Sequence, residues 1–256
     1  IENFCIDPEK IEEKITNKTK AIIAVDIFGK SADISLINKI AKKHKLRVIS
    51  DSSQAICAKY KGKYAGTIVD IGGYNLNYHK HIHTGEGGII VTNNSHLARR
   101  MQLLRNHAEA VIDKKENLSN MIGHNYRLGE IEAAIGIEQF KKLKRLVNSR
   151  ISIARKLNEG LANLKEIKLP KINKNLENSF YVYPIIINYK KIKKSRNFIF
   201  EALKAEGVPA LMKHYINLHL LPIYQKKIGY GTKGFPWSLN KKKYNYQKGI
   251  CPIAEE

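Results

Sequence analysis

Short apolar runs alternate with amphipathic segments in the first part of the chain. The runs AIIAVDIF (residues 21–28), LRVISD (46–51) and GGIIVT (87–92) are rich in β-branched residues and bounded by turn residues, which is typical of buried strands. Between the first two runs, SADISLINKIAKKHK has apolar residues at helical spacing and offers Ser31 and Asp33 as caps. After the third run, NSHLARRMQLLRNH is again amphipathic. This alternation predicts an α/β fold with a mostly parallel sheet flanked by helices.

The pattern changes in the second half of the chain. From Leu128 to about Leu161 it is nearly continuous helix, which favours either a long helix joining two domains or a hairpin of helices. NSFYVYPIIIN then alternates as a strand, SRNFIFEALKAEG predicts a helix ending at Gly207, and VPALMK predicts another strand. We therefore expect a large domain over residues 1–145 and a smaller α+β domain over residues 146–256.

Composition narrows the class of protein. A chain of 256 residues that is 43% hydrophobic can bury the core of one large or two smaller domains. No apolar run reaches the roughly 20 residues that cross a bilayer, and the first residues resemble no signal peptide, so we expect no membrane partner. Cys5, Cys57 and Cys251 are odd in number and far apart, which supports neither disulfides nor a zinc knot. A cytoplasmic location is expected.

The formal net charge of +22 raises nucleic acid as a partner. The lysines, however, are scattered over the whole length in segments such as KKHK, KKLKR and YKKIKK. No nucleic-acid motif or stripe of interleaved aromatic residues accompanies them. We interpret the charge as solvated surface that would also attract an anionic substrate, and we do not expect a nucleic-acid partner.

The segment NYHKHIHTGEGG, residues 77–88, carries the most unusual cluster of side chains. It contains one lysine and three histidines: Lys80, His79, His81 and His83. On a strand the three histidines would share one face and suit a metal, but only Glu86 is placed to complete such a site, so metal is not favoured. A Walker phosphate loop is excluded because the lysine precedes the glycines. The glycines favour a tight turn before the strand that follows.

Lys80 remains as a nucleophilic amine. A lysine that carries pyridoxal phosphate needs an acidic partner for the pyridine nitrogen, because the protonated ring is the electron sink. RVISDSSQA places Asp51 at the carboxyl end of a predicted parallel strand, where α/β sheets bind ligands, with Gln54 just after it. An isolated aspartate there is more often a helix cap, so only the combination with Lys80 points to a site.

Several motifs in the same order resemble a known family. AIIAVDIFGKSADISLINKIAKKHKLRVISDSSQA, NYHKHIHTGEGGIIVTNN, LLRNHAEA and IGHNYRLGEIEAAIG are similar to the pyridoxal-phosphate-dependent nucleotide-sugar aminotransferases of the DegT/StrS type. The resemblance runs through nearly the whole chain, into HYINLHLLPIY and KGICPIAEE. It implies the aspartate-aminotransferase fold, a fold-type-I transferase with pyridoxal 5'-phosphate as cofactor.

The resemblance also assigns site residues. It implies that Lys80 binds the cofactor covalently, that Asp51 pairs with the pyridine nitrogen, and that Gln54 lies against the ring. Asn125, in HNYR, matches a residue that reaches across a dimer interface to the cofactor phosphate of the other subunit. Asn75, five residues before Lys80, stands where the family usually has a phosphate-binding serine, and an amide can still donate to phosphate.

The same resemblance implies the substrates. It points to L-glutamate as amino donor and a nucleotide-linked keto sugar as acceptor, giving an amino sugar for polysaccharide or glycoconjugate biosynthesis. Arg127 is a weak candidate for a substrate anion. His214 and Tyr215 in KHYINLH are further candidates for the sugar diphosphate, with surface packing as the alternative. A cytoplasmic homodimer with shared active sites is implied.

Two alternatives remain within the resemblance. The chain lacks the family's amino-terminal part of the catalytic domain, including a phosphate-binding turn, and the last part of the small domain, so it could be a truncated, inactive member. A family variant replaces the lysine by histidine and acts as a sugar dehydratase. Counting back from GEGG places Lys80, not His79 or His81, at the critical position, which favours transamination.

Overall fold

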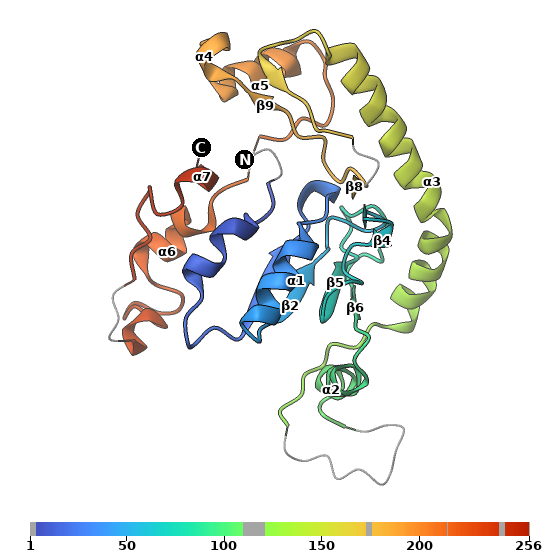
Figure 1. Ribbon diagram of the computed structural model, residues 1–256, viewed down its shortest axis with the longest axis vertical. Coiled ribbons are helices and arrows are strands. Elements are labelled where there is room, and N and C mark those ends of the chain that lie inside the picture. The colour runs from blue at the N-terminus through green and yellow to red at the C-terminus, as the bar shows by residue number, and fades with distance from the viewer. Residues whose placement is uncertain (1–3, 110–120, 173–175, 214, 241–243, 256) are drawn as a thin grey trace. The chain divides into compact units, whose positions relative to one another are not determined.

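The computed structural model describes residues 4–109, 121–172, 176–213, 215–240 and 244–255 (Figure 1). The chain divides into two compact units, Glu2–Ile186 and Ile187–Glu256. The domain boundary that we placed at residue 145 falls within the long helix α3 (Glu130–Leu161) and stays a prediction. Among the described residues, no helix has both the length and the apolarity to cross a membrane.

The first unit is built on a four-stranded sheet. Its strands are β1 (Ala21–Val25), β2 (Arg47–Asp51), β5 (Ile71–Asn75) and β6 (Gly88–Val91), in the order β1-β2-β5-β6. The first three are parallel, and β6 runs antiparallel to β5. This confirms the mostly parallel sheet and the three predicted strands. Strand β5 was not anticipated, because IGGYN contains two glycines and lacks a β-branched run.

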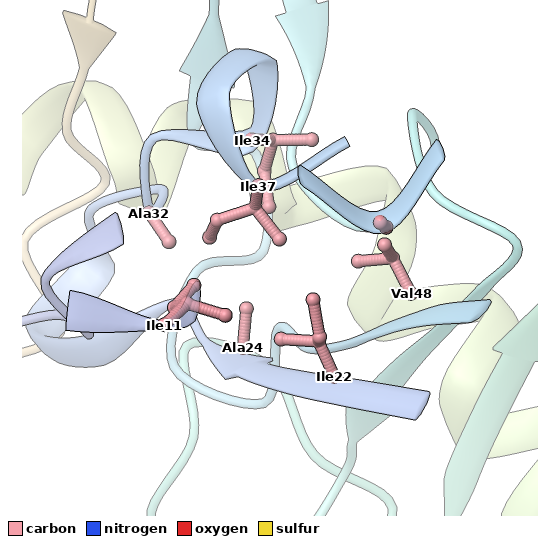
Figure 2. Close-up of a cluster of buried hydrophobic side chains, with 8 residues drawn as sticks. Ile11, Ile22, Ala24, Ala32, Ile34, Ile37 and Val48 are labelled. Carbon is pink, nitrogen blue, oxygen red and sulfur yellow. The ribbon is translucent and has the colours of Figure 1, made fainter. Parts of the chain in front are cut away.

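One face of this sheet is covered by α1 (Ile34–Lys43). The helix begins after Asp33, whose carboxylate accepts a hydrogen bond from the N–H of Leu36 at 3.2 Å, as the capping pattern predicts. Its apolar side chains pack on inward-facing residues of β1 and β2 (Figure 2). The buried cluster comprises Ile11, Ile22, Ala24, Ala32, Ile34, Ile37, Ala41 and Val48. This core holds β1 and β2, whose carboxyl ends contribute to the site, in place against α1.

The opposite face of the sheet carries the remaining alternate residues. Because successive side chains of a strand point to opposite faces, the buried Val48 and Ser50 of β2 place Asp51 on the face away from α1. Ile23 of β1 and Ile90 of β6 are 62% and 61% exposed. Asp51 therefore stands at the end of a strand on an open, largely apolar face.

Two more predicted helices are present in the first unit. Helix α2 (Ser95–Arg105) begins after Asn94, whose side chain accepts from the N–H of Leu97, and α3 is a single helix, as one of the two expected alternatives had it. Small sheets accompany them. These are β4 (Lys63–Tyr64), β3 (Lys59–Tyr60) and β8 (Leu176–Glu177) in one sheet, and β7 (Ile167–Lys168) with β9 (Ile186–Ile187) in another.

The second unit is mainly helical in its described residues. Its α-helices are α4 (Tyr189–Ile192), α5 (Arg196–Ala205), α6 (Pro222–Lys226) and α7 (Pro252–Glu255). Helix α5 was predicted, and Ser195 caps it. The strand predicted for VPALMK is wrong: these residues form no strand, and Pro209 has no N–H for a ladder. The strand predicted over NSFYVYPIIIN shrinks to β9.

Candidate active site

Asp51 ends β2 between two parallel neighbours. In the register of the sheet it lies opposite Val25 of β1 and Gly73 of β5. Its Oδ1 atom accepts hydrogen bonds from the main-chain N–H of Ser53 at 3.1 Å and from the Ser53 hydroxyl. Gly73 has no side chain, and a Cβ built there meets only the carbonyl oxygen of Ser50, at 3.9 Å. The space in front of Asp51 is therefore open to a flat ligand.

A second acidic residue, Asp26, forms hydrogen bonds with Asp51 and with the serines on either side of it. The N–H of Asp26 donates to the carbonyl oxygen of Asp51 at 2.9 Å. The hydroxyls of Ser50 and Ser52 donate to the Oδ2 atom of Asp26 at 2.5 and 2.6 Å, and the N–H of Ala32 donates to Oδ1 at 2.8 Å. Asp26 is fully buried, and this burial raises its pKa while the hydroxyl donors oppose the rise. Sequence reasoning missed Asp26, although it directly follows the apolar strand β1.

Lys80 lies in the turn that follows β5. Its N–H donates to the carbonyl oxygen of Asn77 at 3.0 Å, and its ammonium nitrogen lies 4.8 Å from the ring centroid of Tyr181. Burial lowers the pKa of Lys80, and attraction to Asp51 partly opposes this. Lys80 thus follows β5, the strand next to β2, which Asp51 ends. Tyr181 was not a candidate, because it is distant in sequence and stands in no site motif.

The histidines beside Lys80 do not share a face. Residues 77–83 form turns and bends and no strand, so the shared face that a strand would give them does not arise. His81 is buried with its Nε2 atom 2.9 Å from the carbonyl oxygen of Ser179, whereas His79 and His83 are exposed. Burial lowers the pKa of His81 to about 4. Within the described residues, no group of three or more histidine, cysteine or acidic side chains is placed to hold a metal.

Asn75 and Gln54 are both close to the ends of the central strands. Asn75 closes β5, and its Oδ1 accepts from the N–H of Asn77 at 2.7 Å, so its amide N–H groups are the part that can donate to a ligand. Gln54 accepts from the N–H of Phe28 at 2.9 Å and so ties the loop after β2 to the loop after β1. Phe28 has a φ of 58°, so this backbone needs such support.

An open cleft of about 1180 Å³ extends from the ends of β2 and β5 to α2. Asp51, Ser53 and Asn75 line it on the sheet side. Arg105 of α2 and the rings of His124 and Tyr126 line it elsewhere, and these two rings stack with centroids 5.0 Å apart. Sequence reasoning considered the HNYR segment only for its asparagine and arginine. Alternation within HNYR could have drawn attention to the aromatic residues.

Asn125 and Arg127 occupy the other alternate positions of HNYR. Both are exposed, and neither lines the cleft of its own chain. Asn125 forms a β-bridge with Asn106, and the guanidinium of Arg127 donates to the Oδ1 atom of Asn106 at 3.1 Å. Tyr215 is exposed in the second unit, and His214 lies outside the described residues.

Comparison with known proteins identifies the family. The model of the DegT/DnrJ/EryC1/StrS aminotransferase family matches residues 1–244. The chain belongs to this family. It is 34% identical over 224 residues to the UDP-4-amino-4,6-dideoxy-N-acetyl-beta-L-altrosamine transaminase of Helicobacter pylori, covering 87% of this chain and 58% of that protein. It is 32% identical over 227 residues to the GDP-perosamine synthase of Escherichia coli O157:H7, covering 88% and 60% respectively.

Solved structures confirm the expected fold. The Helicobacter pylori aminotransferase PseC, involved in the biosynthesis of pseudoaminic acid, matches with a TM-score of 0.80 and 32% identity over 91% of this chain and 62% of that one. An E. coli GDP-4-keto-6-deoxy-D-mannose-3-dehydratase with bound hydrated PLP matches with a TM-score of 0.70 and 28% identity, over 80% and 56%. The chain spans about three fifths of the length of the curated relatives that it matches.

Proposed function

We propose that the intact protein uses pyridoxal 5'-phosphate to transfer an amino group to a nucleotide-linked keto sugar. The observation that carries this proposal is the placement of Lys80 in the turn after β5, the strand next to β2, which Asp51 ends, with the Asp51 charge favouring the protonated amine. Family membership and the transaminases among the relatives support it. The alternatives are a sugar dehydratase and an inactive, shortened chain.

The residues fit the cofactor on chemical grounds. Bound pyridoxal phosphate would supply a protonated pyridine ring that withdraws electrons from the substrate carbon. Asp51 would hold the proton on the ring nitrogen, with Gly73 leaving room for the ring. Lys80 would bind the cofactor covalently and, when released, carry the proton to and from the substrate. Its lowered pKa increases the fraction that is a neutral base near pH 7.

Two amides would complete the cofactor site. Asn75 lines the cleft and would donate its amide N–H groups to the phosphate. Gln54 would lie against the ring, held by its bond to the N–H of Phe28. Because Asn75 already uses its oxygen to bind Asn77, it would present donors to an anion. This orientation suits phosphate.

We propose L-glutamate as the amino donor and an amino sugar for polysaccharide or glycoconjugate biosynthesis as the product. The net charge of +22 would attract both the donor and the sugar diphosphate. Arg127, His214 and Tyr215 remain the proposed substrate contacts. The names of the relatives contain UDP- and GDP-linked amino sugars, so UDP- and GDP-linked keto sugars are the first acceptors to test.

We propose that two copies of the chain form a homodimer with shared active sites. Asn125 is exposed and lies outside the cleft of its own chain, which is consistent with a role in the site of a partner subunit. Large apolar side chains are also exposed over the first turns of α3, including Ile131 at 74% and Phe140 at 65%. Such exposure is typical of a surface that another chain covers.

A cytoplasmic location is proposed from the cysteines. Cys5, Cys57 and Cys251 are all free thiols. Free, well-separated cysteines are typical of a reducing compartment, because oxidising compartments favour pairing. Localisation of a tagged chain by cell fractionation tests this proposal.

The dehydratase is the second candidate, because one structural relative has that activity in its name. A histidine would then have to replace the lysine amine. His81 is buried with Nε2 bound to Ser179, and His79 is exposed, so neither is placed as Lys80 is. Release of an unaminated deoxy sugar, in place of an amino sugar, would favour the dehydratase.

The first experiment is reductive trapping. The purified chain is incubated with pyridoxal phosphate, reduced with borohydride and mapped by peptide mass, with Lys80→Ala as the test variant and Lys63→Ala, at an exposed position, as the control. We expect one adduct on Lys80 that Lys80→Ala abolishes and Lys63→Ala retains. Labelling scattered over surface lysines would contradict the proposal and support the inactive chain. A positive result is followed by amination assays with L-glutamate and keto-sugar nucleotides.

A further inference from the structure

Residues 178–181 lie against the loops that follow β1 and β5 and are held by several hydrogen bonds. The N–H of Ser179 donates to the carbonyl oxygen of Gly29 at 2.8 Å. A Cβ on Gly29 would lie 2.5 Å from the main-chain nitrogen of Phe180, so the two backbones are as close as glycine permits. The carbonyl oxygen of Ser179 binds Nε2 of His81. The segment is therefore fixed to the loops after β1 and β5.

Helix α3 holds the same segment from its other end. The guanidinium of Arg150 donates to the carbonyl oxygens of Phe180 and Tyr181 at 3.2 and 3.3 Å. Because Arg150 binds these two carbonyl oxygens, they are not available for the ladder of the longer strand predicted over NSFYVYPIIIN. The two bonds also leave the Tyr181 side chain with little freedom of position, since the residues before it are buried.

The ring of Tyr181 faces the lysine and both neighbouring histidines. Its centroid lies 4.8 Å from the ammonium nitrogen of Lys80, 6.2 Å from the ring of His79 and 5.9 Å from the ring of His81. An ammonium within about 6 Å of an aromatic face is attracted by the ring quadrupole. The ring of Tyr181 therefore lies next to the Lys80 amine and in contact with the rings of both histidines.

We propose that Tyr181 is a positioning residue for Lys80, whose aromatic face holds the amine whenever the lysine is not bonded to the cofactor. The ring keeps the free amine beside the reaction space instead of in solvent. The lysine is then ready to carry a proton. This inference rests on the proposed role of Lys80. The contact between Tyr181 and Lys80, however, exists in the chain without cofactor and can be tested there.

Neighbouring charges and burial also affect the balance between the charged and neutral forms of Lys80. Asp51 attracts the ammonium, whereas burial disfavours it. Besides burial, the charges of Arg150 and Lys80 lower the pKa of the neighbouring His81. His79 stands exposed beside the ring, and His81 is neutral near pH 7 because burial lowers its pKa to about 4. Replacing Tyr181 by leucine would keep water away while removing the attractive ring face. The charged form of Lys80 would then be less favoured.

The test follows acetylation of Lys80 by acetic anhydride as a function of pH, in the full chain without cofactor, with peptide masses as the readout. Tyr181→Leu should lower the apparent pKa of Lys80 by roughly half a pH unit to one unit, as expected from the loss of a cation–π contact. Tyr181→Phe keeps the ring and should leave the value of the unmodified chain. The exposed Lys63 serves as internal control for the reagent.

Two results would overturn the inference: an unchanged Lys80 profile in Tyr181→Leu, or an equal shift in Tyr181→Phe, which would assign the effect to the hydroxyl. Circular dichroism and thermal unfolding show whether each variant folds, and Tyr181→Met, which also lacks a ring, replaces Tyr181→Leu should that variant not fold. The outcome is separable from the proposed function, because no cofactor is present. A Lys80 that titrates as expected but takes up no pyridoxal phosphate would contradict the function alone.

Discussion

Asp26 follows β1 and Asp51 ends the neighbouring parallel strand β2, and the N–H of Asp26 donates to the carbonyl oxygen of Asp51 at 2.9 Å. The Asp26 carboxylate also accepts from the serines on either side of Asp51. The two carboxyl groups therefore have different tasks. Asp26 is buried and binds protein donors, whereas Asp51 lines the cleft.

Replacement of Asp26 should cost stability. Asp26→Ala leaves two buried hydroxyls and the N–H of Ala32 without their acceptor, so we expect the free energy of unfolding to fall by about 3–5 kcal/mol. Asp26→Asn retains one acceptor oxygen, so its free energy of unfolding should fall by less. Urea unfolding measures the change for both variants. Asp7→Ala, at an exposed cap, is the control and should cost about 1 kcal/mol or less. Equal losses at the two positions would contradict this account of Asp26.

The adjacent glycines of β5 should respond differently to alanine. A Cβ on Gly72 would lie 1.9 Å from the carbonyl oxygen of Gly66, so Gly72→Ala should destabilise the fold by about 3 kcal/mol or more. Gly73→Ala should fold, because nothing closer than 3.9 Å meets its Cβ. Its methyl group would enter the space beside Asp51 and weaken pyridoxal phosphate binding about tenfold. Urea unfolding and cofactor titration distinguish the two effects, and normal cofactor binding by Gly73→Ala would argue against the proposed ring position.

His81 should make stability depend on pH. Burial lowers the pKa of His81 to about 4 from 6.5, so the unfolded chain takes up a proton at a higher pH than the folded chain. The stabilisation is complete above about pH 6.5 and is lost as the pH falls towards about 4. Between about pH 7 and pH 5 the loss amounts to about 2 kcal/mol. In His81→Gln the loss over this range should be smaller by that amount, as measured by urea unfolding. An identical pH dependence in both proteins would show that His81 titrates normally.

Asp51→Asn should reduce activity with little effect on folding. The amide oxygen can still accept from Ser53, so the stability should change by about 1 kcal/mol or less. An amide cannot hold the positive charge on a pyridine nitrogen, so the amination rate should fall about a hundredfold or more. Asp33→Asn, at the cap of α1, is the matched control and should leave the rate unchanged. Full activity in Asp51→Asn would exclude the proposed role of Asp51.

Local sequence patterns were sufficient for much of the first unit. Short apolar runs rich in β-branched residues located β1, β2 and β6, and helical spacing located α1 and α2, because these signals depend on residues close together in the chain. The patterns failed at β5, whose glycines carry no strand signal but are needed for close backbone approach. They also gave no sign that His81 is buried, because its bond to the carbonyl oxygen of Ser179 joins residues 98 positions apart.

The sequence by itself determined the alternating α/β order, the family resemblance and the pairing of Lys80 with Asp51 as candidate site residues. Only the tertiary structure decided that Tyr181 faces Lys80, that Asp26 braces Asp51, and that Asn125 lies outside the cleft of its own chain. The reason is physical. Caps and periodicity act between near neighbours in the chain, whereas burial, ring contacts and buried hydrogen bonds join residues that come together only when the sheet and its crossing segments are packed.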